Sequence, residues 1–277
     1  MKGQIKRFRG EQITLATAAT FATVRGKPPW ANLLELDAPS ATLESITVAF
    51  GPKIERLYVY DASIGASARY QDLTKALTDR DTGTDSALTL NALQTADRIY
   101  VGCKRRYDGL AVDVVLTNTI GTAAMVGEYF PAPGTVTDLT ITEGTRATAS
   151  LDQDGLITFT TPTGPWPLLT LRNAVKGLAE DIGEDVPVTE GLRWMRLRVD
   201  AAITDTTVSI AEVTALMNPD IVGPGEEAEG FATVRITTNP GGKLPYRFKL
   251  GPEFGGVELV SASIISAANL NWYRIEE

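Results

Sequence analysis

The chain has 277 residues, of which 43% are hydrophobic and 22% charged, the composition of an ordinary globular protein with room for a sizeable core. Its formal net charge of −8 opposes phosphate backbones, so we expect no nucleic-acid partner. No stretch approaches the roughly 18 consecutive apolar residues of a membrane-spanning helix, and we expect no membrane partner either.

The sequence contains no histidine and a single cysteine, Cys103. Histidine is the commonest acid–base group at neutral pH and the commonest ligand of transition metals. No G-x-S-x-G, P-loop or G-x-G-x-x-G motif occurs. We therefore expect no catalytic residue, no cofactor, no metal and no enzymatic activity, with a glycan-active enzyme based on two carboxylates as a rival interpretation. Cys103 is expected to be a small buried apolar residue rather than a reactive thiol.

The N-terminal 45 residues lack a sustained period and contain a proline-rich stretch, "KPPWANLLELDAPSA". Proline fixes φ and donates no ladder hydrogen bond, so residues 1–45 are predicted to form an extended N-terminal arm. Trp30 is an apolar anchor on this arm. Its basic candidates for docking on an acidic neighbour are Lys2, Lys6, Arg7 and Arg9. A solvated terminus is the alternative.

Residues 46–217 show repeated two-residue alternation with turn residues between the runs, which predicts an antiparallel, jelly-roll-like β-sandwich. In "ERLYVYDAS", Leu57 and Val59 fall on one face of the strand and Tyr58 and Tyr60 on the other. Strands are predicted over 45–50, 55–63, 86–93, 97–104, 109–118, 123–130, 135–142, 156–162, 193–200 and 208–216.

One short inserted helix is predicted within residues 167–183, where Leu168, Leu171, Val175 and Leu178 recur at helical spacing. A weaker helix candidate covers residues 70–79, which fit a strand equally well. Residues 218–230 combine prolines, glycines and acids and are predicted to be a linker. Residues 231–277 then form a C-terminal β extension or a small β domain.

Three further residues are candidates for an interaction surface: Trp166, Trp194 and Arg196. In "RWMRLRV" the tryptophan and arginines alternate with apolar residues, which predicts one inward face and one face carrying Trp194 and Arg196. This second face is interpreted as structural packing. A subunit contact is one form of such packing, because Trp and Arg are enriched at interface centres. An exposed aromatic platform for sugar rings is the alternative.

Two acidic turns have the spacing of calcium ligands around a glycine. These are "DRDTGTD", with Asp79, Asp81, Asp85 and Gly83, and "DQDG", with Asp152, Asp154 and Gly155. Neither has the distal glutamate of an EF-hand in register, and aspartate and glycine also dominate ordinary β-turns. The prediction remains that no metal binds.

Three stretches carry a family resemblance: "DGLAVDVVLTNTIGTAAMVGEYF", "TDLTITEGTRATASLDQDGLITFTTPTGPW" and "GLRWMRLRVDAAITDTTVSIAEVTAL". Their succession resembles a β-sandwich module of structural proteins in tailed-bacteriophage virions. The matching positions are the turn Glu143-Gly144-Thr145, the element Asp154, Gly155, Ile157, Phe159, Pro162 and Trp166, and the late strand with Trp194 and Arg196. The resemblance covers about residues 97–217 and continues weakly upstream to residue 46.

This resemblance implies a non-enzymatic virion structural protein, assembled in the host cytoplasm. The expected role is a capsid decoration or cement protein on the exterior of the head. The implied partners are the major capsid protein or other virion proteins, together with further copies of the chain as a homo-oligomer such as a trimer. The alternatives are a tail, neck, baseplate or fibre component, or a carbohydrate-binding adhesin module.

Overall fold

The computed structural model describes residues 4–15, 23–40, 44–78, 93–205, 208–216, 234–237, 245–261 and 263–276. These residues are mostly β, with short helical turns, and their sheets are built from antiparallel strand pairs. The mainly β, antiparallel sandwich predicted from the alternation of apolar and polar residues is thereby confirmed. The predicted strand at 86–93 and the predicted linker at 218–230 fall outside the described residues, apart from Leu93.

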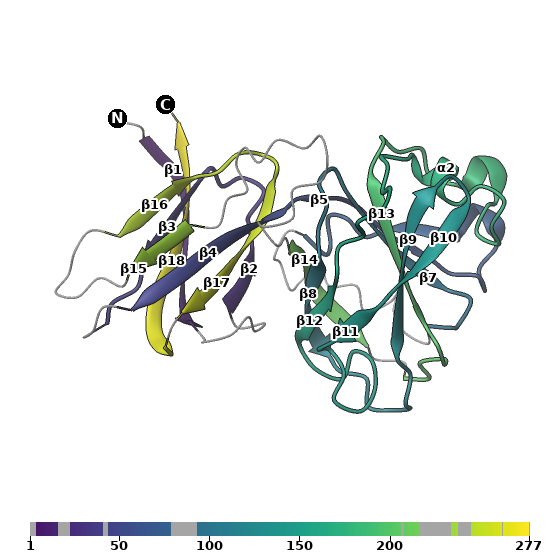
Figure 1. Cartoon of the computed structure of the whole chain (residues 1–277), viewed down its shortest axis with the longest axis horizontal. Helices are drawn as coiled ribbons and strands as arrows, with labels where there is room; N and C mark the ends of the chain where they lie inside the picture. The colour runs from purple at the N-terminus through teal and green to yellow at the C-terminus, as the bar shows by residue number, and fades with distance from the viewer. Residues whose placement is uncertain are drawn as a thin grey trace. The chain divides into compact units, whose positions relative to one another are not determined.

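The chain divides into two compact units, and the first contains both ends of the chain. We call this unit, Met1–Lys53 with Leu216–Glu277, the terminal sandwich. The second unit, Ile54–Ala215, is the inserted sandwich. In Figure 1 the colours show that the strands of the terminal sandwich come from the beginning and the end of the sequence.

This division corrects the predicted one. The described parts of residues 1–45 are not a separate arm, and those of 231–277 are not a separate extension, because the two segments form strands of the same sheets. The physical reason is that neither segment can bury its apolar face alone, since an isolated pair of strands is marginally stable at best in water. The predicted sandwich over 46–217 accordingly begins later, after Lys53.

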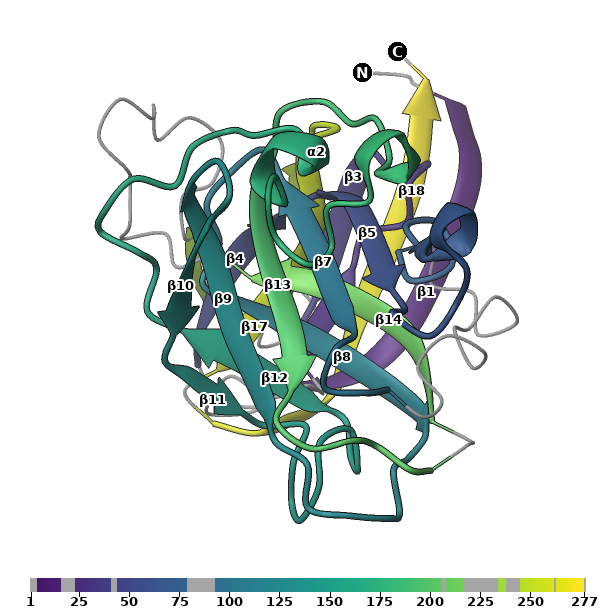
Figure 2. The same ribbon diagram turned by 90° about the vertical axis from the view of Figure 1, so that its right-hand side faces the viewer.

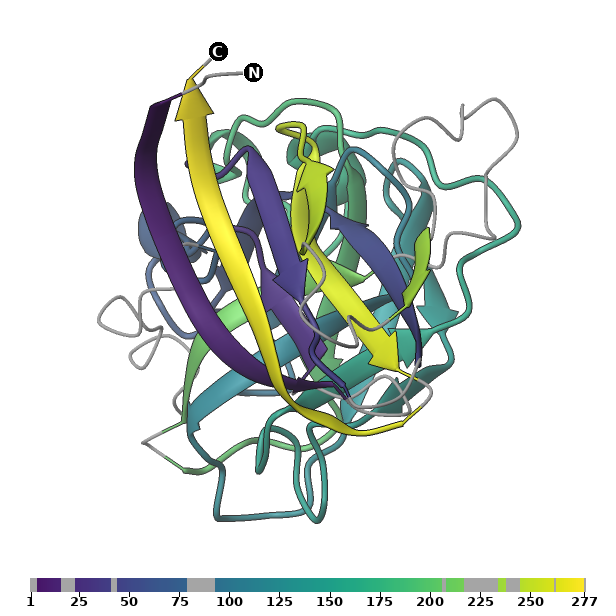
Figure 3. The same ribbon diagram turned by 90° about the vertical axis from the view of Figure 1, so that its left-hand side faces the viewer.

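The terminal sandwich has two four-stranded sheets. The first has the order β1 (Gln4–Leu15), β18 (Ile265–Glu276), β3 (Leu33–Asp37) and β16 (Tyr246–Lys249). The second has the order β15 (Val234–Thr237), β4 (Ser45–Pro52), β17 (Phe254–Ser261) and β2 (Val24–Gly26). Figure 3 shows β1 and β18 running side by side along their whole length.

Alternate residues of the two sheets of the terminal sandwich meet in one core. Leu34 and Leu36 on β3, Ile46 and Val48 on β4, and Trp272 on β18 are all fully buried there. The spacing of two residues between neighbours on a strand is what places them on one face. This alternation positions the intervening residues of β1, β18 and β3 on the opposite, outer face of the first sheet.

The inserted sandwich consists of a six-stranded and a four-stranded sheet, which Figure 2 shows together. The six-stranded sheet has the order β10 (Thr135–Leu139), β9 (Met125–Ala132), β13 (Arg193–Val199), β7 (Arg98–Cys103), β5 (Ile54–Tyr60) and β6 (Tyr70–Asp72). The four-stranded sheet has the order β11 (Ile141–Glu143), β12 (Gly155–Phe159), β8 (Gly109–Leu116) and β14 (Ser209–Leu216).

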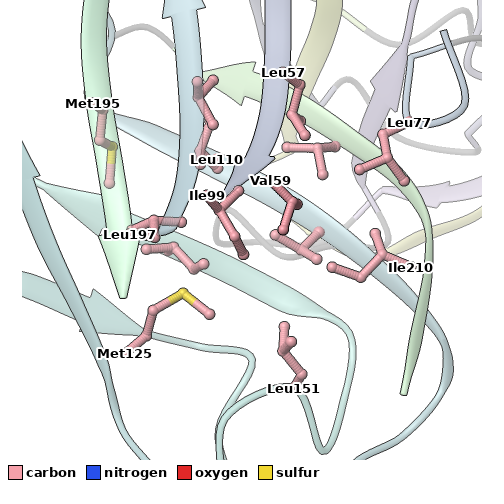
Figure 4. Close-up of a cluster of buried hydrophobic side chains, with 14 of the residues drawn as sticks. Leu57, Val59, Leu77, Ile99, Leu110, Met125, Leu151, Met195, Leu197 and Ile210 are labelled. Atoms are coloured by element: carbon pink, nitrogen blue, oxygen red, sulfur yellow. The ribbon is translucent and has the colours of Figure 1, made fainter. Parts of the chain in front are cut away.

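Apolar side chains from both sheets fill the interior of the inserted sandwich (Figure 4). The cluster surrounds a cavity of about 20 Å³. All the residues that line it are apolar, among them Leu57, Ile99, Leu110, Leu197 and Ile210. A cavity of this size is about as large as one water molecule, and it offers none of the polar partners that a buried water needs. We therefore treat it as a packing defect of the core.

The central strands of the six-stranded sheet are buried on both faces. Leu57 and Val59 of β5 face the sandwich interior, whereas Tyr58 and Tyr60 enter a second cluster with Trp194 on the opposite face. The prediction that these residues alternate between the two faces is confirmed. The second cluster is covered by the segment between β12 and β13, which contains α2 (Leu171–Ala174) and the 3-10 turn η4 (Gly183–Asp185).

The predicted helix at 167–183 is much shorter in the structure. Only α2, four residues long, is α-helical, with the Thr170 side chain accepting a hydrogen bond from the Asn173 N–H at its start. After α2, the backbone leaves right-handed helical geometry at Gly177 and again at Gly183, whose φ angles are 75° and 66°. Leu171 and Val175 are buried as the pattern predicts, but Leu168 is 52% exposed.

Two other predicted elements differ in detail. A 3-10 turn, η2 (Ala66–Ala68), precedes strand β6, and the chain continues as turns up to Thr78. The helical alternative for residues 70–79 is therefore wrong for the residues that the structure describes, 70–78. The predicted strand at 135–142 is two strands, β10 and β11, which belong to different sheets. A chain that turns a corner between packed sheets keeps its alternation while changing partners, so the pattern alone does not reveal the break.

Candidate interaction surface

The basic residues near the N-terminus lie on β1, which pairs with β18 from Gln4↔Glu276 to Leu15↔Ile265. We call this pair the β1–β18 ribbon. Lys6 Nζ lies 2.7 Å from Glu276 Oε2, and both side chains are about half exposed. An exposed pair of this kind contributes about 0–1 kcal/mol to stability. Lys2 lies outside the described residues.

Arg7 and Trp30 are brought together by the fold. The Arg7 guanidinium lies 4.5 Å from the centre of a Trp30 ring, which is the geometry of a cation–π contact. Trp30 is half-buried against the core of the terminal sandwich. Arg9 is the β1 partner of Trp272. Two of the predicted interaction residues thus contact each other within one sandwich.

The far end of the ribbon is fixed by the side chain of Asn32. Asn32 Nδ2 donates to the Ile275 carbonyl at 2.7 Å, and the Ile275 N–H donates to Asn32 Oδ1 at 2.9 Å. The Asn32 N–H also donates to the Tyr273 carbonyl at 3.0 Å. One amide side chain therefore continues the ladder beyond the end of β3 and holds the ribbon as part of the sheet.

A polar cluster centred on Glu35 occupies the outer face of the same sheet. The Tyr273 hydroxyl and Asn271 Nδ2 donate to Glu35 Oε1, and Arg247 Nε donates to Glu35 Oε2 at 2.8 Å. Partial burial raises the pKa of Tyr273, and the Glu35 carboxylate beside it raises it further. Three donors from two neighbouring strands keep this carboxylate satisfied although it is almost buried.

Phe8 lies on the ribbon next to this cluster. Its ring centre is 5.1 Å from that of Tyr273, and it remains 56% exposed. A Cβ atom at Gly10 would approach the Phe8 ring to 2.8 Å and Asn271 Oδ1 to 2.7 Å. The missing side chain at Gly10 is thus what allows the Phe8 ring to lie across the strand.

The ribbon therefore combines exposed apolar and basic groups. Ile5 is 60% exposed and Phe8 56%, and the cations Lys6 and Arg7 lie between them in the sequence of β1. Exposed apolar groups next to cations on an otherwise acidic protein are suited to contact with another protein surface. We identify the β1–β18 ribbon as the candidate interaction surface.

Trp166 and Trp194, the other predicted aromatic candidates, are core residues of the inserted sandwich. Trp166 is 2% exposed and packs against the rings of Tyr107, Tyr129 and Phe159. Its Nε1 donates to the Trp194 carbonyl at 3.1 Å. Trp194 is fully buried, and its own Nε1 donates to the Leu169 carbonyl at 2.7 Å. Neither ring presents the exposed platform that sugar stacking requires.

Arg196 is buried in a network of charges. Its Nε donates to Glu128 Oε2 at 2.6 Å, and its Nη1 donates to Glu180 Oε1 at 2.9 Å. Arg98 Nε lies 2.9 Å from the same Glu180 oxygen, and Arg198 Nε lies 3.4 Å from Glu128 Oε1. Burial lowers the pKa of Arg196, but the two carboxylates outweigh this effect and raise it, so the guanidinium stays charged.

Sequence reasoning missed Glu128 and Glu180 as the partners of Arg196. Glu128 stands in the alternating stretch "MVGEYF", on the same face as Val126 and Phe130, and its β13 partner in register is Arg196. An acidic residue in one predicted strand and a basic residue in another can stand opposite each other when the two strands pair. This signal could have predicted the contact between Glu128 and Arg196. Glu180 lies in the covering segment, where no local period points to a partner.

The acidic turn at "DQDG" is occupied by backbone contacts. Asp152 accepts hydrogen bonds from the N–H groups of Ala147, Thr148 and Ala149. Slight burial raises the pKa of Asp152, but these hydrogen bonds outweigh it and lower the pKa to about 2. Asp154 accepts from the Val114 N–H. Among the described residues, no group of three or more His, Cys, Asp or Glu side chains is arranged to hold a metal ion, and the turn at 79–85 lies outside them.

Cys103 is fully buried in the core of the inserted sandwich, as predicted. Burial raises the pKa of its thiol well above the usual value, and the nearby Glu55 raises it further. A thiol that stays protonated is a poor nucleophile. Within the part of the chain that the structure describes, no helix is long and apolar enough to cross a membrane.

Comparison with known proteins found no matching family model and no matching curated protein. Among solved structures, the chain was aligned with the infectious bursal disease virus VP2 subviral particle at a TM-score of 0.16 and 8% sequence identity. The alignment covers 100% of this chain and 83% of that one. A similarity at this level supports no conclusion about fold or function.

Proposed function

We propose that this protein is a non-enzymatic structural protein of a tailed-bacteriophage particle, and that it decorates and stabilises the exterior of the capsid. The observation that carries this proposal is the β1–β18 ribbon, where one strand bears both exposed apolar side chains and cations on an acidic chain. The resemblance of residues 97–217 to virion β-sandwich modules supports the same role. Its partners would be the major capsid protein or other virion proteins.

The proposed mechanism is adhesion through many weak contacts. Ile5 and Phe8 would lose water at each site, while Lys6 and Arg7 would face acidic groups of the capsid lattice. A single contact of this size is weak, but a protein whose contacts are repeated over a lattice gains avidity without any new contact. Such adhesion needs rigid, preformed surfaces, and the Asn32 bonds that fix the ribbon supply that rigidity.

The first test is the copy number of the protein relative to the major capsid protein in purified particles, measured by quantitative mass spectrometry. Hundreds of copies would support capsid decoration. A few dozen or fewer would move the protein to the neck, tail, baseplate or a fibre, and absence from particles would overturn the virion proposal.

A second test uses the ribbon itself. Phe8→Asp places a charge at the exposed aromatic position, and we expect the variant to be lost from particles when they are sedimented through salt. The matched control is Val188→Asp, since Val188 is 86% exposed on the inserted sandwich and does not belong to the ribbon. Equal retention of the two variants would remove the ribbon from the proposed contact.

A further inference from the structure

Among the strands that the structure describes, none covers one edge of the ribbon. In the order β1-β18-β3-β16, β1 stands at the end, and its one described partner is β18. A strand at the edge of a sheet presents a row of backbone N–H and C=O groups that can pair with a further strand. At 12 residues, β1 offers a long edge for such pairing.

The usable part of this edge is defined by two irregularities. The register between β1 and β18 is continuous from Arg7 to Ile13, and it shifts between Ile5 and Arg7 and between Ile13 and Leu15. Bulges bend a strand and interrupt its pairing. An added strand is therefore confined to Arg7–Ile13, and the midpoint of this segment is Gly10.

The charges on the segment are complementary to themselves about that midpoint. Arg9 and Glu11 flank Gly10 on the inward face. If a second copy of β1 runs antiparallel with Gly10 opposite Gly10, each Arg9 stands opposite Glu11 of the second copy. Centring the pair on Arg9 or on Glu11 instead would set two like charges opposite each other, which is destabilising.

These two residues are also engaged within their own chain, where Glu11 Oε2 lies 3.6 Å from Arg25 Nε. In the dimer, Glu11 would keep its contact with Arg25 and would also stand opposite Arg9 of the second copy. On the outer face, each Phe8 ring lies over its own Gly10 and so leans toward the midpoint. The two Phe8 rings would meet there and form one continuous aromatic patch on the outer face of the paired sheet.

We propose that β1 pairs antiparallel with β1 of a second copy of this chain, about Gly10, and forms a symmetric dimer with one continuous sheet across both copies. A two-fold interface places the same patch of both subunits in contact, as this self-complementary segment requires. The inference goes beyond the proposed function and does not rest on it, because the pairing is a property of the free protein.

The test is sedimentation velocity of the purified full-length protein from low to high micromolar concentration. We expect a species of twice the chain mass of 29.7 kDa. R9E and E11R each set like charges opposite one another, and each should raise the dimer dissociation constant at least about tenfold. The double variant R9E/E11R restores opposite charges and should dimerise again. Lys249→Glu, on β16 at the other edge of the sheet, is the matched control and should leave the dimer unchanged.

Mixing the two single variants is the sharpest form of this test. Neither should dimerise alone, but R9E opposite E11R places opposite charges at both positions, so the mixture should form heterodimers. Circular dichroism checks that each variant is folded, and R9E alone carries the test if loss of the Arg25 contact in E11R unfolds the chain. A monomer at every concentration, a trimer, or a dimer indifferent to the single exchanges would overturn the proposal.

Discussion

Trp166 links two layers of the inserted sandwich through one side chain. Its ring belongs to the core between the sheets, and its Nε1 donates to the backbone of Trp194, whose own ring faces the second cluster. Trp194 then donates to Leu169 in the covering segment. Alanine substitutions in this region should therefore lower the free energy of unfolding strongly at core positions and little at exposed ones.

Trp166→Ala should lower the free energy of unfolding of the inserted sandwich by about 3–5 kcal/mol, because it creates a cavity and removes a buried hydrogen bond. Urea denaturation followed by circular dichroism measures this change. Leu168→Ala, at a half-exposed position two residues away, should change the same free energy by less than about 0.5 kcal/mol. Similar losses for both variants would contradict the assignment of Trp166 to the core.

The charge network around Arg196 yields a second prediction. Glu180→Gln removes the carboxylate shared by Arg196 and Arg98, so the buried Arg196 keeps only Glu128 as an ion-pair partner and the partly buried Arg98 loses its ion pair with Glu180. Removing one partner of a buried ion pair costs about 3–5 kcal/mol. Thermal unfolding should show the loss. Glu190→Gln, which breaks the more exposed pair with Arg56, is the control and should cost about 1 kcal/mol or less.

Asp152 makes a pH-dependent contribution to stability. Its pKa in the folded protein is about 2, below the ordinary value of 3.8, so its contribution is complete above about pH 4 and is lost as the pH falls toward 2. Because the side chain is only partly buried, solvent screens it, and we expect this contribution to be only about 1 kcal/mol. Asp152→Asn cannot titrate, so the difference in unfolding free energy between wild type and variant should shrink below pH 4. A difference that stays constant down to pH 2 would refute this account.

Among the elements, the β11–β12 hairpin depends on a close backbone approach. A Cβ atom at Gly155 would come within 2.2 Å of the Gly144 carbonyl carbon and oxygen, so Gly155→Ala forces the backbone apart. We expect a loss of about 1–3 kcal/mol in the free energy of unfolding, measured by urea denaturation. Gly164→Ala meets nothing nearer than the Tyr129 hydroxyl at 3.9 Å and should be close to neutral.

Local pattern predicts strands well where both faces obey one period. In β5 and β13 the alternation assigns each residue to its face correctly, because the side-chain period of a strand is fixed by its geometry. What it does not predict is that the polar-looking face of β13 is also buried. Arg196 is buried because Glu128 and Glu180 neutralise it, and these partners lie 68 and 16 residues away in sequence.

Pairing between distant segments is the other feature that local pattern does not reach. Gln4 pairs with Glu276 and Leu33 with Tyr273, at opposite ends of the chain. The basic and proline-rich composition of residues 1–45 is equally typical of a free arm, so it does not predict a sandwich strand. Three residues of the candidate surface, Lys6, Arg7 and Arg9, were named from the sequence. The places of Phe8, Gly10 and the Glu35 cluster follow only from the register of β1 with β18.

At the scale of the whole molecule, one sandwich interrupts the other. The chain leaves the terminal sandwich after Lys53 and returns at Leu216. The inserted sandwich is therefore joined to its host at both of its ends. An inserted unit with its own core can fold without its host, whereas the host needs both of its chain segments. β18 lies between β1 and β3, so the first sheet of the terminal sandwich cannot form without the C-terminal segment.

Removal of residues 245–277 should therefore unfold the terminal sandwich and leave the inserted sandwich intact. Hydrogen–deuterium exchange with mass spectrometry measures this directly: amides of β4 should lose protection, while those of β7 and β13 should keep the protection they have in the full chain. A fragment of residues 54–215 should show the same protection in β7 and β13, because the large apolar core of that unit lies within it. Loss of protection in both sandwiches on truncation would mean that the two units fold as one cooperative body.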